Sequence, residues 1–183
     1  LADIGGPDAF GYEFIDNDEA GGPTYNWRTV TTSVGTASGC DDCSSQVALP
    51  FPFDFYGTTY NQIWAGSNGY VTFDSGDWEY TNRALSNAGA EHVAIHAWWD
   101  DWDPRPSSAH VRYGAFGSAP NRIFVVSWET VPHYSYSSNP NPVSFQIQLF
   151  EANNSIQLHY QDTDSTGSAN DNGASGTIGI DNG

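Results

Sequence analysis

The chain has 183 residues, enough for one substantial core, and carries 22 acidic residues against five basic ones, a formal net charge of −17. A surface of that sign repels phosphate backbones and anionic lipid, so it argues against nucleic acid and membrane surfaces as partners and favours divalent cations. All five basic residues are arginines, which excludes chemistry that needs a lysine amine, and no apolar run approaches the roughly 20 residues of a membrane span.

The N-terminal part, residues 1–30, is predicted to be an extension of a single domain that spans residues 1–183. A short apolar strand is expected at Phe10–Ile15, followed by the acidic, glycine-rich loop Asp16–Pro23. Residues 49–73 hold two aromatic runs with a period of two around a turn-rich centre. This pattern is typical of paired antiparallel strands.

The rest of the chain continues the strand pattern. A buried strand is predicted at His92–Trp99, and a hairpin is predicted from Ala109–Phe116 and Arg122–Val131. Apolar and polar side chains alternate in Val143–Glu151, which predicts one apolar and one polar face. Shorter strands are expected in Ile156–Tyr160 and Thr177–Ile180. Helix is minor, with a turn or two expected at Ala84–Ala90.

Together these segments predict an all-β fold: an antiparallel, jelly-roll-like β-sandwich of about nine or more strands, with little helix. Sandwiches protect their edge strands, often with lysine, which this chain lacks. Its edges must therefore depend on prolines, acidic charge or an added partner strand. The N-terminal residues Phe10, Tyr12 and Phe14 are the expected assembly strand, able to add to a neighbouring subunit.

Cys40 and Cys43 lie in the polar loop GCDDCSS. A redox or zinc-binding pair is one interpretation, and zinc would need two further ligands. A small structural disulfide in an exported protein is the favoured one. The surrounding acids would raise the pKa of either thiol, which disfavours a reactive thiolate. The chain begins with Leu1 rather than Met, which agrees with removal of a signal peptide during export.

The segments LPFPFDFYG, SNGYVTF, VAIHAWWDDWDP, VRYGAFG and NRIFVVSWETVPHY occur in this order between Val47 and Ile180. In order and spacing they resemble the nidogen-like domain and the related plexin-domain-containing proteins, and above all the versions in secreted bacterial and archaeal proteins. The resemblance implies a secreted or cell-surface β domain that acts in adhesion or matrix interaction. It brings no catalytic residues.

The loop WWDDWDP is the strongest candidate metal site. Asp100, Asp101 and Asp103 follow directly on a predicted strand, and Ca²⁺ takes six to eight oxygen ligands of this kind. The alternative is a solvated acidic loop whose aspartates cap turns.

A second candidate calcium site comprises Asp16, Asp18 and Glu19, which precede a glycine pair but lack the spacing of an EF-hand. A weaker acidic group is interpreted as part of an exposed loop: Asp162, Asp164, Asp171 and Asp181.

Several aromatic residues lie in loop-like sequence, where their rings are candidates for exposure: Trp78, Tyr80, Trp102, Tyr134 and Tyr136. Exposed rings next to carboxylates stack on sugar rings in carbohydrate-binding modules and also anchor protein interfaces. The competing interpretation is that the rings close the ends of the sandwich.

An enzyme is disfavoured. A glycosidase needs two acids flanking a cleft, and Glu129 is the nearest approach to a general acid in an apolar strand. A serine hydrolase lacks its G-x-S-x-G motif. His92 and His96 share one face of a predicted strand, but they are interpreted as core or surface histidines rather than as zinc ligands.

The sequence therefore predicts a non-catalytic, calcium-stabilised extracellular module that binds a glycan or an extracellular protein. The alternative is a structural subunit of a filament or surface layer, in which copies of the chain assemble by strand addition. A glycoside-active enzyme comes a distant third.

Overall fold

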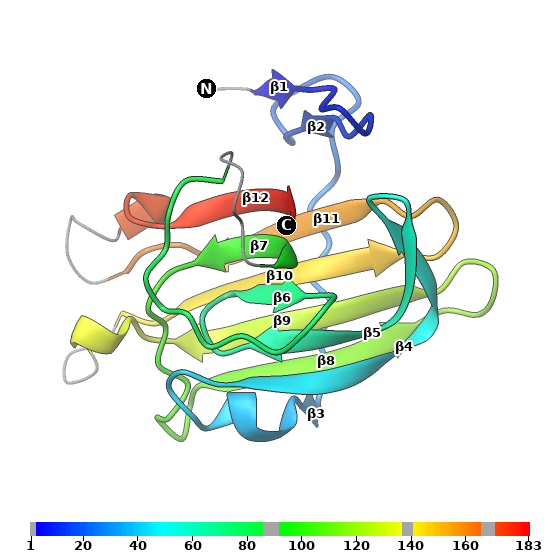
Figure 1. Cartoon of the computed structure of the whole chain (residues 1–183). Helices are drawn as coiled ribbons and strands as arrows, with labels where there is room; N and C mark the ends of the chain where they lie inside the picture. The colour runs from blue at the N-terminus through cyan, green and yellow to red at the C-terminus, as the bar shows by residue number, and fades with distance from the viewer. Residues whose placement is uncertain (1–2, 86–91, 137–140, 166–170) are drawn as a thin grey trace.

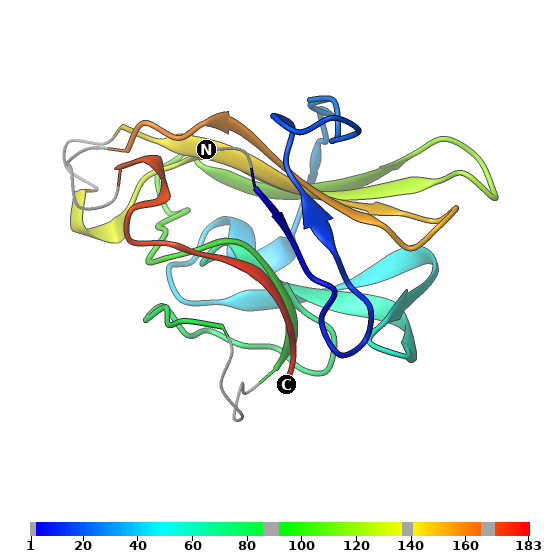
Figure 2. The same ribbon diagram turned by 90° about the horizontal axis from the view of Figure 1, so that it is seen from above.

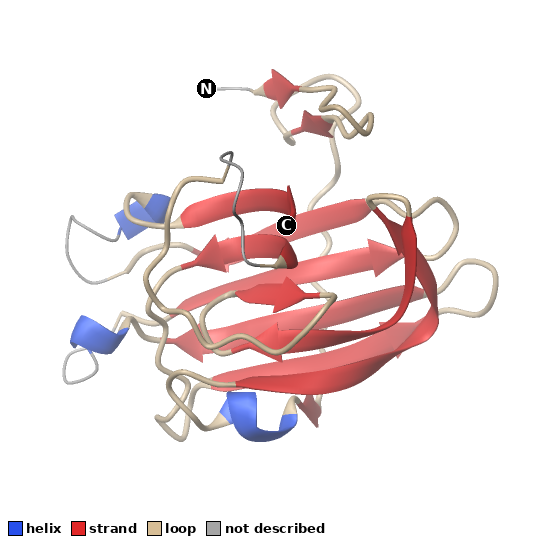
Figure 3. Ribbon diagram, in the orientation of Figure 1, coloured by secondary structure: helices blue, strands red, loops and turns tan. Residues whose placement is uncertain are grey.

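The computed structural model describes residues 3–85, 92–136, 141–165 and 171–183. Over these residues the chain is all-β, with twelve strands in three antiparallel sheets and three short 3-10 helices (Figures 1 and 3). The predicted antiparallel sandwich is confirmed. The helical turns expected at Ala84–Ala90 lie almost wholly outside the described residues.

Two five-stranded sheets face each other and form the sandwich (Figure 1). The front sheet has the order β12-β7-β6-β5-β4 and consists of β4 (Ser44–Phe55), β5 (Thr58–Gly66), β6 (Tyr70–Thr72), β7 (Val93–Trp99) and β12 (Thr177–Asn182). The back sheet has the order β11-β10-β9-β8-β3 and consists of β3 (Thr32–Ser33), β8 (His110–Phe116), β9 (Ile123–Val131), β10 (Val143–Phe150) and β11 (Ile156–Asp162).

The third sheet is an N-terminal hairpin of β1 (Ile4–Gly5) and β2 (Phe14–Ile15), which stands beyond the edge strands β12 and β11 (Figures 1 and 2). The 3-10 helices are η1 (Gly35–Ser38), η2 (Tyr134–Tyr136) and η3 (Asp171–Gly173). No helix among the described residues has the length and apolar character needed to cross a membrane.

Strand β4 shows how the sequence makes an edge strand. Its apolar side chains alternate with exposed ones, so that Phe51, Phe53 and Phe55 all point into the core. Pro50 and Pro52 occupy exposed positions between them, and proline is tolerated on an edge strand because it removes a donor that has no strand partner there. Prolines therefore blunt this edge in a chain without lysine.

The core lies between the sheets and is rich in aromatic rings. Trp128 stacks on Phe145 with ring centroids 5.2 Å apart, and its Nε1–H donates to the Gly66 carbonyl at 2.9 Å. Trp98 and Trp102 meet edge to face next to them. Each indole N–H that bonds in this way removes the cost of burying a polar group, so the rings contribute their full apolar area.

The outer face of the back sheet is covered by a strap, residues 26–30, which comes from the N-terminal extension. Gln146 exchanges two hydrogen bonds with the backbone of Arg28, donating at 2.7 Å and accepting at 3.2 Å. Gln148 donates to the Asn26 carbonyl at 2.8 Å. The two glutamines thus face away from the core, as the alternation predicts, yet Gln146 is 0% exposed because the strap lies over it.

Candidate functional site

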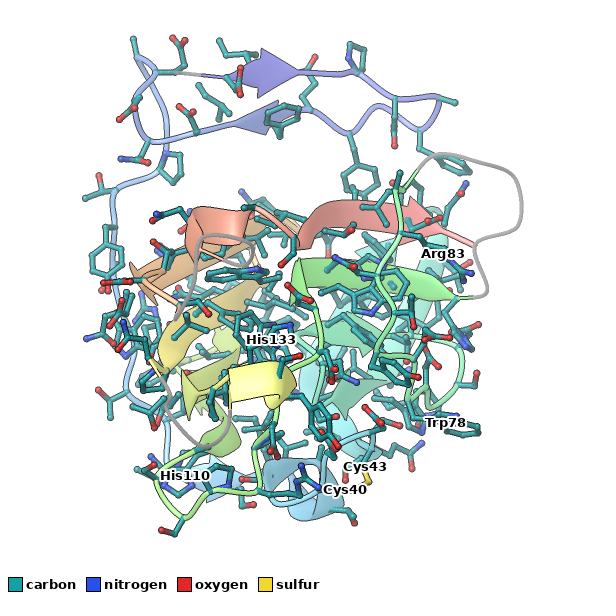
Figure 4. All side chains as sticks on the ribbon, turned by 90° about the vertical axis from the view of Figure 1, so that its left-hand side faces the viewer. Cys40, Cys43, Trp78, Arg83, His110 and His133 are labelled. Carbon is teal, nitrogen blue, oxygen red and sulfur yellow. A yellow bond between two sulfur atoms is a disulfide. The ribbon has the colours of Figure 1, made fainter. Side chains whose placement is uncertain are left out.

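The end of the sandwich that faces the viewer in Figure 4 is built from loops, and we call it the acidic end. It combines the Cys40–Cys43 loop, the turn between β5 and β6, and the loops that follow β6 and β7. Asp41, Asp42 and Asp101 each bring a carboxylate oxygen here to within 4.8 Å of the others. These three residues form the acidic cluster. Within the described residues, no other group of three potential His, Cys, Asp or Glu ligands comes as close together.

The Cys40–Cys43 loop positions two of these carboxylates. The cysteines form a disulfide with Cα atoms 5.8 Å apart, which confirms the favoured interpretation of the pair. Asp41 and Asp42 lie inside the ring that this bond closes. Ser67 ties the ring to the end of β5, because its N–H donates to the Cys43 carbonyl at 2.8 Å and its hydroxyl accepts from the Cys43 N–H at 3.1 Å.

The electrostatics of the acidic cluster are unfavourable without a cation. Burial raises the pKa of Asp101 to about 6; the charge of His133 opposes this rise, and the negative charges of Asp42 and Asp41 add to it. Burial and Asp42 likewise raise the pKa of Asp41, whose Oδ1 is buried without a hydrogen-bond partner among the described residues. Arg105 compensates in part, with its guanidinium 3.3 Å from the other Asp41 oxygen.

The neighbouring acids of the loop after β7 are already satisfied by the protein. Burial alone would raise the pKa of Asp100, but hydrogen bonds from His133, the Ser175 hydroxyl and the Asp101 N–H outweigh it and lower the pKa. Asp103 forms an ion pair with Arg105, at 2.7 Å from its Nε. Of the three predicted calcium ligands in this loop, only Asp101 therefore joins the acidic cluster.

The second predicted calcium site lies in the turn after β2. One Asp16 oxygen accepts from the Asp3 N–H at 2.8 Å and the other from the Asp18 N–H at 3.0 Å. The N–H of Gly22 donates to the Glu19 carbonyl, closing the loop. Asp16 is thus engaged as a turn-capping residue, and calcium binding by Asp16, Asp18 and Glu19 stays a prediction.

Exposed aromatic rings lie in two loops that are hydrogen-bonded to residues at the acidic cluster. Trp78 is 68% exposed and Tyr80 50%, and both lie in the loop after β6. Figure 4 shows Trp78 at this end of the sandwich. Asn68 connects this loop to the cluster, since its Nδ2 donates to Asp42 at 3.0 Å and to the Glu79 carbonyl at 3.5 Å. In the second loop Tyr134 is exposed, and its N–H donates to the Asp101 carbonyl at 2.8 Å.

The expected exposure of Trp102 is wrong. Its side chain is 0% exposed and its Nε1–H donates to the Trp98 carbonyl at 2.7 Å, because the chain after β7 folds back into the sandwich and bridges to His133. A ring without a free face cannot stack on a ligand. The side chain of Tyr136, the remaining predicted ring, lies outside the described part of the structure.

Glu129, His92 and His96 each contact other side chains, although Glu129 Oε1 and His96 Nδ1 are buried without a hydrogen-bond partner among the described residues. Glu129 forms an ion pair with Arg112 at 2.7 Å. His92 lies 3.2 Å from Asp74. His96 is buried and stacks on Trp99 with ring centroids 4.8 Å apart, and burial lowers the pKa of its imidazole to about 4. The two histidines belong to no cluster of potential metal ligands among the described residues.

The predicted assembly strand Phe10–Ile15 is shorter than expected. Only Phe14–Ile15 is a strand, and it pairs with Ile4–Gly5 of the same chain. Tyr12 packs on Phe55 and Tyr56, and Phe10 meets Tyr56 edge to face, so these two rings attach the hairpin to the sandwich. Phe14 is 60% exposed.

Three residues of the acidic end were missed by the sequence interpretation: Asp41, Asp42 and Asn68. A signal for the first two was present, because a disulfide across Cys-Asp-Asp-Cys holds two acids in a tight loop. These acids not only raise the pKa of nearby thiols but also offer oxygen ligands to a cation. For Asn68 the sequence predicts a turn and nothing about its contact with Asp42.

The comparisons with known proteins agree with the resemblance. A family model described as NIDO related matches residues 12–183, nearly the whole chain. The match begins well before Val47, so it includes Tyr12, the strap and the disulfide loop. No curated protein and no solved structure matches the chain.

Proposed function

Because the chain belongs to the NIDO-related family, we propose that it is a non-catalytic, secreted or cell-surface binding module that is stabilised by calcium and binds carbohydrate at its acidic end. The family points to an extracellular module of the adhesion type. The Cys40–Cys43 disulfide supports this location, since disulfides persist in oxidising compartments.

The observation that carries the proposal is the acidic cluster beside loops that carry exposed aromatic rings. Three carboxylates within 4.8 Å of one another repel each other, and Asp101 and Asp41 both have raised pKa values. A calcium ion would replace that repulsion by attraction and would give the buried Asp41 Oδ1 a partner. Asp41, Asp42 and Asp101 are therefore the residues proposed to hold it.

Carbohydrate is the proposed ligand because of what surrounds the cluster. The indole of Trp78 offers an open apolar face. The carboxylate of the preceding residue, Asp77, accepts a hydrogen bond from the backbone N–H of Trp78 at 2.7 Å. A flat ring supplies stacking area and neighbouring carboxylates accept hydrogen bonds from hydroxyls. A protein ligand anchored on the same rings is the competing outcome.

Calcium binding is tested by thermal unfolding of the chain in Ca²⁺ and in excess EGTA. A ligand that binds only the folded state stabilises it, by about 2.7 kcal/mol at a free concentration 100-fold above Kd. The proposal expects a lower Tm in EGTA. Asp42→Asn should remove the calcium-dependent shift, whereas Glu13→Gln, which removes one exposed charge from the N-terminal hairpin, should keep it. Identical melting curves in Ca²⁺ and EGTA would contradict the proposal.

The ligand class is tested on a glycan array, with the chain in Ca²⁺ and again in EGTA. Retention on one group of glycans in Ca²⁺ supports the carbohydrate proposal. Retention on none would direct attention to a protein ligand for the same rings.

A second candidate function, a structural subunit that polymerises, is favoured by one observation. The N-terminal hairpin has only two residue pairs and exposes Ile4 and Phe14, although Phe10 and Tyr12 attach it to the sandwich. A neighbouring subunit would cover these side chains. Deleting residues 1–15 should then abolish polymers and leave a soluble subunit, as judged by size-exclusion chromatography and negative-stain images. An intact chain that is monomeric at every concentration and calcium level would contradict this second function.

A further inference from the structure

The turn between β10 and β11 carries the sequence Asn153-Asn154-Ser155, which is the only Asn-X-Ser/Thr in the whole chain. Such a sequence is the acceptor for N-linked glycans when it lies on the surface of a secreted protein. The turn is closed by a hydrogen bond from the Phe150 N–H to the Ser155 carbonyl at 3.0 Å. The acceptor sequence is therefore presented on a defined hairpin turn.

The side chain of Asn153 is exposed and arranged for modification. Its Oδ1 accepts the Ser155 N–H at 3.2 Å and the Ser155 hydroxyl at 2.8 Å. Both bonds use the oxygen, and Nδ2 has no partner among the described residues. The hydroxyl thus lies beside the amide, which is the pairing of groups that the acceptor sequence requires.

The adjacent asparagine has a different, structural role. Asn154 adopts a φ of 53°, in the left-handed region that asparagine tolerates better than most residues. Its Oδ1 accepts the Asp54 N–H at 3.1 Å and so links the turn to β4. One asparagine of the pair holds the turn, and the other projects from it.

We propose that Asn153 is N-glycosylated, with a lipid-diphosphate-linked oligosaccharide as the donor. The bond between the glycosyl C1 and the diphosphate oxygen breaks, and the lipid diphosphate leaves with the electron pair. A C1–Nδ2 bond forms, and the proton that Nδ2 loses passes to solvent, which balances the negative charge on the departing diphosphate. The transfer requires export, so the inference rests on the extracellular location of the proposed function.

The position of the turn keeps the glycan away from the proposed ligand site. Figure 1 shows the β10–β11 turn at the opposite end of the sandwich from the loop that follows β7. A glycan on Asn153 would shield the turn and the adjacent part of β4, and it would leave Trp78 and the acidic cluster open. Glycosylation and ligand binding are therefore expected to be independent.

The test is mass spectrometry of the protein isolated from the medium or cell envelope of the producing organism. Chymotrypsin should release a peptide that begins at residue 151 and ends at Leu158 or Tyr160, and this peptide is expected to carry the mass of a glycan. Peptide-N-glycosidase should remove that mass and convert Asn153 to Asp while Asn154 stays unchanged. An exported protein whose Asn153 is unmodified would overturn the proposal.

Variants produced in the same organism separate this site from other modifications. Asn153→Gln and Ser155→Ala should both lose the glycan completely, whereas Ser155→Thr should retain it. A glycan that persists in Ser155→Ala would overturn the assignment. Asn153→Gln should keep the calcium-dependent shift in Tm, so failure of the glycosylation proposal and failure of the proposed function give different results.

Discussion

The interior of the sandwich and its acidic end treat polar groups in opposite ways. In the interior the indole N–H groups of Trp102 and Trp128 have acceptors and Gln146 is matched to the backbone of the strap, although Trp98 Nε1 is buried without a partner among the described residues. At the acidic end three carboxylates lie together and Asp41 Oδ1 has no partner among the described residues. The interior groups are mostly paired, whereas the acidic end leaves carboxylates crowded together, and this crowding is what the proposed calcium ion would relieve.

The largest loss of stability is expected from the interior. Trp128→Ala removes a fully buried ring that stacks on Phe145 and leaves the Gly66 carbonyl without its donor. The expected cost is about 3–5 kcal/mol of unfolding free energy. Chemical denaturation measures it, and Trp78→Ala is the matched control because it deletes the same side chain from an exposed position. Similar losses at both positions would break the distinction between the two regions.

A smaller loss is expected where the strap meets the back sheet. Gln146→Ala leaves the N–H and the carbonyl of Arg28 without these partners in a partly buried position. Each buried group left unpaired costs about 1–3 kcal/mol. Gln46→Ala, at an exposed position of β4, is the control and should change stability by less than about 0.5 kcal/mol. Equal effects of the two substitutions would show that the strap does not depend on these bonds.

These two substitutions mark what the sequence can and cannot predict. The alternation in β10 correctly gives the direction of Gln146, because the two faces of a strand are fixed by the backbone. Which segment covers a face is a long-range property, and nothing in Gln146 or its neighbours indicates that residues 26–30 return over it. For the same reason Trp102 was expected to be exposed in its loop, although it is packed inside the sandwich.

The candidate site shows the same limit. The loop after β7 was recognised as acidic from its composition, but the side chains that share a site are chosen by the fold. The Asp100 carboxylate is hydrogen-bonded to His133 and Ser175, whereas the Asp101 carboxylate lies close to those of the disulfide loop. Because Asp41 and Asp101 are far apart in the sequence, local spacing could not bring them together, and only the disulfide itself was predictable from its cysteines.

The acidic end is expected to respond to substitution with the opposite sign. The pKa of Asp101 is raised to about 6 in the folded chain, so the folded state holds this proton more tightly than the unfolded state, and calcium-free stability falls as pH rises from about 4 to about 6. Asn at position 101 cannot ionise. Asp101→Asn should therefore increase calcium-free stability above pH 6, flatten its dependence in this window and weaken calcium binding.

Denaturation at pH 4 and pH 7 of protein freed of calcium at neutral pH and transferred to calcium-free buffer, with calcium titration by calorimetry, measures these effects. Asp162→Asn is a control in an acid that lies outside the acidic cluster. An Asp101→Asn variant that loses stability in EGTA at pH 7 would mean that this carboxylate is satisfied within the protein, and the contrast with the interior would be lost.

The smallest effect on stability and the largest effect on binding are expected from Trp78→Ala. The ring is 68% exposed, so its loss should change the unfolding free energy by less than about 0.5 kcal/mol. Stacking on an exposed ring depends on its open face, and alanine offers none. Binding of the glycan that the array identifies should therefore fall at least about tenfold, which corresponds to about 1.4 kcal/mol.

Phe14→Ala removes an equally accessible ring from the N-terminal hairpin and should leave glycan affinity unchanged. Calorimetric titration of both variants with that glycan measures the difference, and equal affinities would exclude Trp78 from the ligand site.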